Sequence, residues 1–138
     1  MKRNFFKLIL PVAFIALIIV SCTRMKADEM IIGTWKVDTI FAENVDTSQI
    51  TQARLDQASD MQKKVYFVVH ENGQMDLISP FGAKTANWTM DNDSLILTAE
   101  FIDTKQISRL LFDEITETKL VLKEESPSGI FTTVYVKQ

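Results

Sequence analysis

From residue 33 to the end, the chain alternates between apolar and polar residues in short runs that turn residues separate. This pattern is typical of an antiparallel barrel or sandwich, because successive side chains of a strand point to opposite faces. We expect eight strands, at residues 33–42, 64–70, 74–79, 84–90, 94–99, 105–112, 119–125 and 129–137. Since nearly all links are short, sequential strands should pair as a meander, and eight such strands tend to close into a barrel with room for one small ligand.

Three local patterns refine this prediction. Strict alternation in the first strand puts four residues on one face: Trp35, Val37, Thr39 and Phe41. Asn72-Gly73 predicts a tight hairpin, because both residue types tolerate positive φ. The one long link, residues 46–62, predicts a helix of about three turns. Asp46 or Thr47 would cap this helix, which we expect to lie across one end of the barrel.

The first 21 residues have the features of a signal peptide. Three basic residues precede an uncharged apolar run at residues 8–20. As a helix this run would span about 20 Å, which is shorter than the roughly 30 Å hydrocarbon core of a bilayer. The run therefore fits the apolar region of a signal peptide better than a membrane span. The residues that follow, Ile19-Val20-Ser21-Cys22, resemble a bacterial lipobox.

The lipobox resemblance implies cleavage before Cys22 and lipidation of that residue, which would anchor the chain in a membrane. Stable anchoring needs more than one acyl chain, and a triacylated cysteine meets this need. The alternative, an ordinary thiol, fits poorly in an oxidising envelope without a second cysteine. Because no aspartate follows Cys22, we expect outer-membrane anchoring, on the periplasmic face or the cell surface. The predicted organisation is a signal peptide (1–21), a lipidated N-terminus and linker (22–30) and a barrel domain (31–138).

The charge of the remaining chain limits its partners. Without residues 1–21, the chain keeps 117 residues (138 − 21), a length that suits one domain with one core. It keeps 12 of the 15 Lys and Arg and all 18 Asp and Glu, a formal charge of −6 (12 − 18). Nucleic-acid binding needs clustered basic residues, so we expect no nucleic-acid partner.

The residue types present do not predict a catalytic or metal site. His70 is the only histidine, and a base without a nucleophile and an orienting group makes no triad. With Cys22 lipidated, His70 would also be the only nitrogen or sulfur ligand for zinc. Asp91-Asn92-Asp93 lacks the glycine and distal glutamate of a calcium loop and predicts a turn. The acidic pairs at 113–114 and 124–125 fit solvated strand ends. We therefore expect no enzyme, no metal and no cofactor.

Several motifs, in this order, resemble the lipocalin-like lipoproteins of Gram-negative gut anaerobes. They are the lipobox, Gly33-Thr34-Trp35, a helical insertion, ENGQ (71–74), ANWTM (86–90) and the late Ile115-Thr116 with Leu120 and Leu122. The resemblance covers residues 17–137 and implies an eight-stranded up-and-down barrel whose closed end is plugged by Trp35. An arginine packs over that tryptophan in lipocalins, and Lys137 is the candidate for its place. The chain departs from the pattern at Ala86-Asn87-Trp88, where Gly-x usually precedes the tryptophan.

Alternation places eight apolar residues inside the barrel, as a core or as the contacts of a ligand. They are Trp35, Phe67, Leu77, Trp88, Leu97, Leu110, Phe112 and Leu122. Two functions follow from these alternatives. The barrel binds a small apolar or amphipathic ligand, with the helix at 46–62 as a lid or plug. Otherwise it is a solid barrel that contacts an envelope protein partner through that helix or the Ser79–Gly82 turn.

Overall fold

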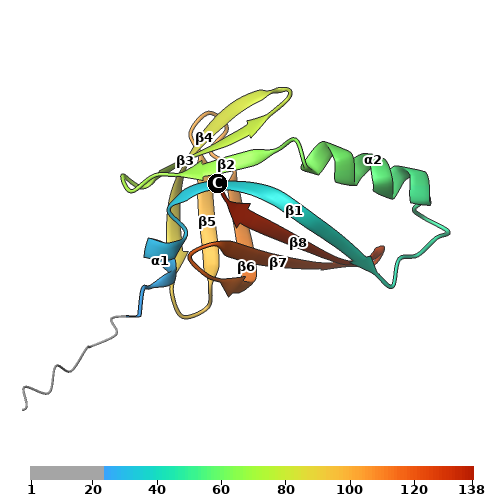
Figure 1. The fold of residues 1–138 in the computed structure, drawn as a ribbon. Helices are drawn as coiled ribbons and strands as arrows, with labels where there is room; N and C mark the ends of the chain where they lie inside the picture. The colour runs from blue at the N-terminus through green and yellow to red at the C-terminus, as the bar shows by residue number, and fades with distance from the viewer. Residues whose placement is uncertain (1–23) are drawn as a thin grey trace, which may run out of the picture.

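The computed structural model describes residues 24–138 (Figure 1). The predicted signal peptide and Cys22 lie outside the described residues. The elements are α1 (Ala27–Met30), β1 (Gly33–Glu43), α2 (Gln52–Gln62), β2 (Tyr66–Val69), β3 (Gln74–Ser79), β4 (Gly82–Asp91), β5 (Ile96–Phe101), β6 (Ile107–Ile115), β7 (Lys119–Ser126) and β8 (Gly129–Lys137).

The eight strands form a closed barrel in sequence order, and β8 returns to pair with β1. Every pairing is antiparallel. This confirms the predicted fold class, an all-β up-and-down barrel with one helix after the first strand. The strands begin and end within a few residues of their predicted bounds. The predicted Asn72-Gly73 turn is present, with a positive φ at Gly73 alone (83°).

A bulge in β1 corrects the predicted alternation of this strand. Val37 lies opposite Tyr135, and Thr39 lies opposite the adjacent Val134, so that Asp38 is the extra residue. An extra residue shifts the period by one position, and all later side chains change faces. Ile40 and Ala42 therefore share the inner face with Trp35. Phe41, which was predicted for that face, points outward and is 53% exposed.

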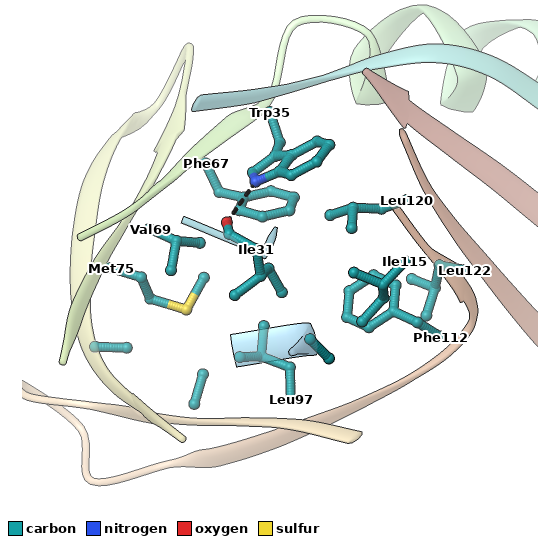
Figure 2. Packing of buried hydrophobic residues seen from close by; sticks show 13 residues of the cluster. Ile31, Trp35, Phe67, Val69, Met75, Leu97, Phe112, Ile115, Leu120 and Leu122 are labelled. Carbon is teal, nitrogen blue, oxygen red and sulfur yellow. Dashed lines mark hydrogen bonds between the residues drawn. The ribbon is translucent and has the colours of Figure 1, made fainter. Parts of the chain in front are cut away.

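The core lies at the end of the barrel that α1 covers. Figure 2 looks into this end and shows side chains from the surrounding strands turned toward Ile31, which directly follows α1. Ile31 and Trp35 are both fully buried. The Trp35 indole donates a hydrogen bond from Nε1 to the Ile31 carbonyl oxygen over 2.7 Å. Burial of a tryptophan is favourable when its N–H is paired in this way.

Two further contacts hold α1 in the closed end. The Lys137 ammonium donates to the Met30 carbonyl oxygen over 3.0 Å and lies 4.9 Å from the centre of the Trp35 ring. Lys137 thus occupies the place over the tryptophan that the resemblance suggested for it. At the start of α1, the Asp28 amide donates to the Asn92 side chain over 2.8 Å. Ala27, within the segment 22–30 that was predicted as N-terminus and linker, is buried in the core.

The opposite end of the barrel is incomplete on one side. β2 pairs only with residues 33–36 of β1, whereas β8 follows β1 as far as Glu43. The second half of β1 therefore extends beyond β2, and α2 lies alongside it, at the far end of the barrel from α1 (Figure 1). Gly129, the first residue of β8, lies close to the end of β1. A Cβ atom at this position would come within 3.0 Å of the Glu43 carbonyl oxygen, so this close approach favours glycine.

The helix α2 has 11 residues, the predicted three turns, but it begins later than the predicted cap at Asp46 or Thr47. It begins at Gln52, with Thr51 as its N-cap, and the Thr51 hydroxyl accepts a hydrogen bond from the Arg54 amide over 3.3 Å. Asp46 instead closes a turn, in which its carboxylate accepts the Ser48 amide over 3.0 Å. This local bond competes with helix formation and delays the start of the helix. Among the 11 residues of α2, none is buried.

Candidate functional site

A cavity of about 750 Å³ lies between α2 and the extended part of β1 and β8. This volume falls within the range of small-molecule sites in proteins. The strand side of the cavity is formed by Ile40, Ala42 and Phe131, and the remaining walls by Val45, Thr47, Ile50, Thr51, Gln52, Leu55, Asp56, Ala58, Ser59 and Gln62. We call it the α2 cavity.

The strand wall of the α2 cavity is the inner face of the barrel. Ile40 lies opposite Thr133, and Ala42 lies opposite Phe131. Thr133 is buried and shares its face with Tyr135, two residues further along β8. The α2 cavity therefore lies on the inner-face side of β1 and β8 and is not a groove on the outer surface of the barrel.

The two walls of the cavity differ in polarity. The strand wall is aliphatic and aromatic, whereas α2 contributes hydroxyl, amide and carboxylate groups, from residues Thr51, Gln52, Asp56, Ser59 and Gln62. Leu55 is the large apolar side chain on the helical wall and is half-buried. Such a pair of walls matches a molecule with one apolar and one polar side.

Hydrogen bonds hold the turn before α2 more firmly than α2 itself is held. The Asp46 amide donates to the Ser128 carbonyl oxygen over 3.0 Å, which joins the turn before α2 to the turn between β7 and β8. Ser128 also donates from its hydroxyl to the Gln49 side chain over 3.5 Å. Because α2 buries no side chain, its displacement would expose little additional apolar surface. This geometry suits a lid that moves about a fixed tip.

Tyr135 packs against Phe67 of the core. Their rings meet edge to face, with centres 5.2 Å apart. Burial, and to a smaller extent the Glu124 carboxylate, raises the pKa of Tyr135 to about 12. The phenol is therefore neutral at physiological pH. Glu124 lies opposite Phe131 in the sheet, so its carboxylate faces the interior near the cavity wall.

All eight residues that the sequence placed inside the barrel do lie in the core or against it. Five are buried, namely Trp35, Phe67, Leu97, Phe112 and Leu122, and three are partly buried against them, namely Leu77, Trp88 and Leu110. None of the eight lines the α2 cavity. Their contact with a ligand therefore remains a prediction. Of the residues that line the cavity, Ile40 and Ala42 were missed because the bulge at Asp38 changes the face on which they lie.

His70 takes part in a hydrogen-bond network at the β2–β3 turn. Its Nε2 lies 2.8 Å from a carboxylate oxygen of Asp76, whose other oxygen accepts the Thr85 hydroxyl over 2.8 Å. The Trp88 indole donates to the His70 carbonyl oxygen over 3.0 Å. The carboxylate lies between the imidazole and the hydroxyl, so the imidazole has no hydroxyl to deprotonate in this network. The network joins β2, β3 and β4.

Asp91 forms the turn that the sequence predicted. Its carboxylate accepts the Asp93 amide over 2.9 Å and the Ser94 amide over 3.2 Å. These bonds, that from Ser94 above all, lower the pKa of Asp91 below its usual value. Within residues 24–138, no group of three or more His, Cys, Asp or Glu side chains is placed to hold a metal ion. No helix in this range has the length and apolar character to cross a bilayer.

Comparison with known proteins adds little to this picture. No family model and no curated protein matches the chain. Among solved structures, a DUF4847 family protein from Bacteroides vulgatus is similar at 12% identity and a TM-score of 0.49, over 77% of this chain and 94% of that one. A lipocalin-like protein from Bacteroides uniformis is similar at 10% identity and a TM-score of 0.49, over 79% and 99%. The architecture itself, a closed barrel of eight antiparallel strands in sequence order with a helix after the first, is the lipocalin-like arrangement.

Proposed function

We propose that this protein is a lipid-anchored protein of the bacterial envelope whose barrel binds a small amphipathic molecule in the α2 cavity. The observation that carries the proposal is the cavity itself, with its apolar strand wall and polar helical wall. The barrel interior near α1 is occupied by the side chains of its core. We therefore place the ligand at the open end, with α2 as its lid.

The expected affinity follows from the apolar surface that such a ligand would bury. A buried methylene contributes about 0.8 kcal/mol, so an eight-carbon chain contributes up to about 6 kcal/mol. Association costs several kcal/mol, which hydrogen bonds to the polar wall partly offset. Dissociation constants between about 1 mM and 1 µM are therefore expected for simple amphiphiles.

A pair of adjacent substitutions tests the position of the site. The barrel wall closes within residues 33–137, so residues 24–138 contain the whole closed barrel. We would titrate this domain with octyl glucoside, below its critical micelle concentration, by calorimetry. Ala42→Trp fills the α2 cavity and should weaken binding by about tenfold or more. Phe41→Trp places the same side chain on the outer face of the same strand and should leave binding unchanged.

Equal binding by both variants and the unsubstituted domain would place the ligand elsewhere. No heat from any of the three proteins, together with a ligand-free native mass spectrum after expression in the periplasm, would refute the binding function. A bound molecule in that spectrum, lost on denaturation, would identify the natural ligand class.

The anchoring part of the proposal rests on the sequence around Cys22. In a Gram-negative host supplied with labelled palmitate, the full chain should acquire label and sediment with the outer membrane. Cys22→Ser should acquire none. An unlabelled wild-type chain in the soluble periplasmic fraction would refute lipidation while leaving the binding function intact.

One observation supports a second function, that of a protein-interaction module. Phe81, in the Ser79–Gly82 turn between β3 and β4, is 85% exposed. Phenylalanine is among the aromatic residues that are enriched at protein–protein interfaces. A photoreactive amino acid at position 81 should then crosslink one defined envelope protein, and the same group at Asp103 should not. Identical crosslinks from both positions would argue against a specific contact at Phe81.

A further inference from the structure

We propose that the α2 cavity prefers cationic and neutral amphiphiles over anionic ones, with Asp56 as the residue that sets this preference. The inference rests on the proposed binding function and specifies the charge of the ligand. Among the described residues that line the cavity, Asp56 is the one charged residue. A bound fatty acid, with a carboxylate head, would therefore meet a carboxylate and no cation in the wall.

The position of Asp56 makes its charge available to a ligand. It lies in the middle of α2 and is exposed at the polar wall. The Gln52 side chain donates from Nε2 to Asp56 Oδ1 over 2.9 Å, which orients the carboxylate. In the described part of the chain, the other carboxylate oxygen has no protein donor, so a ligand ammonium could bind there.

The surroundings reinforce the negative potential. Glu124 lies opposite Phe131 on the inner face, and Phe131 is part of the cavity wall. Residues 24–138 also contain 12 basic against 18 acidic side chains. A net negative charge attracts cations toward the mouth and slows the approach of anions.

Several features oppose this preference, and each is weaker. Arg54, Lys63 and Lys64 are cations on or directly after α2, but none of them lines the cavity. The N-terminus of α2 at Thr51 carries the positive end of the helix dipole, equivalent to about half a unit charge, against the full charge of Asp56. Lys84 also faces the interior, but it lies over the Phe101 ring, 5.9 Å from its centre, and does not line the α2 cavity. The carboxylate of Asp56 therefore dominates.

The test compares three amphiphiles with the same chain and different head groups. Octyltrimethylammonium, octyl glucoside and octyl sulfate would each be titrated into residues 24–138 by calorimetry, below their critical micelle concentrations. An exposed ion pair changes affinity by up to about fivefold. Attraction of the cation and repulsion of the anion together should make the cation bind about tenfold tighter than the sulfate. This ratio should decrease as salt is added.

Asp56→Asn should reduce the tenfold ratio of cation affinity to sulfate affinity to about twofold, whereas Asp60→Asn should leave it near tenfold. Asp60→Asn is the matched control, because it removes the same charge from the same helix at a residue that does not line the cavity. Tighter binding of octyl sulfate, or an equal loss of preference in both variants, would overturn the role of Asp56. Equal binding of all three probes would refute the charge preference and leave the binding function standing. No binding of any probe would refute both.

Discussion

The two ends of this barrel differ in how their side chains and backbone groups are used. At the α1 end, Ile31 and Trp35 are fully buried, and the carbonyl groups around α1 accept hydrogen bonds from Trp35 and Lys137. At the α2 end, the helix buries none of its residues and faces a cavity of about 750 Å³. One end is packed like an ordinary protein core, and the other is left open.

This difference suggests a division of roles between the ends. Close packing and paired polar groups supply stability, and they leave no space for a ligand. An open end with a weakly held helix contributes little stability and can change without unfolding the rest. Substitutions at the α1 end should therefore affect unfolding, and those at the α2 end should affect binding.

The largest expected effect is the difference in stability between a leucine-to-alanine substitution at the α1 end and one at the α2 end. Leu97 is fully buried in the core, so Leu97→Ala should reduce the free energy of unfolding by about 2–5 kcal/mol. Leu55 is half-buried on α2, and alanine is at least as good a helix former, so Leu55→Ala should change stability by less than about 1 kcal/mol. Urea unfolding followed by tryptophan fluorescence measures both.

Binding of octyl glucoside should show the opposite pattern. Leu55→Ala removes apolar surface from the cavity and should weaken binding. The Leu97→Ala variant should bind octyl glucoside with unchanged affinity under conditions in which it is folded. Similar stability losses in the two variants would mean that α2 is part of the core, and would contradict the division of roles.

A smaller effect is expected at the fastening of α1. Lys137→Met removes the hydrogen bond to the Met30 carbonyl and the contact with the Trp35 ring, at a cost of about 1–2 kcal/mol. Amide hydrogen exchange should show faster exchange at Met30 and Ile31, whose amides bond within α1. Lys137→Arg keeps a donor and a cation and should retain most of the protection. Unchanged exchange in the methionine variant would show that Trp35 alone holds α1.

The smallest effect is expected from the exterior network of His70 and Asp76, and it depends on pH. The hydrogen bond with His70, followed by that from Thr85, lowers the pKa of Asp76 below its usual value. A group with a lowered pKa in the folded state stabilises the protein above its unfolded pKa, and loses this effect as pH falls through the folded value. The urea midpoints of the wild type and Asp76→Asn should therefore differ at pH 6 and converge below about pH 4. A difference that persists at low pH would exclude the carboxylate as its cause.

Much of the fold could be predicted because strand alternation and turn residues are local signals. The eight strands and their order followed from these signals, and the interior positions of residues such as Leu97 and Phe112 followed from alternation. The helix α1 was missed because four residues are too few to show a helical period. Its stability comes from contacts with Trp35, which follows α1 in the sequence, and with Lys137, which lies at the other end of the chain.

The candidate site was harder to predict, because it depends on strand lengths and on one bulge. β2 ends its pairing at Lys36, and this leaves the second half of β1 to face α2. The bulge at Asp38 then brings Ile40 and Ala42 to the inner face. Pairing register and bulges are properties of the assembled sheet, so alternation within a single strand assigned Phe41 to the wrong side.

The position of α1 also has a consequence for the route of the ligand. Only five peptide units separate Cys22 from Ala27, a reach of at most about 18 Å for an extended chain. A chain anchored at Cys22 would therefore stand with its α1 end near the bilayer and its α2 cavity facing the aqueous compartment (Figure 1). In this upright orientation, cargo would enter from the water or from a carrier protein, and direct extraction from the supporting membrane would require the domain to tip over.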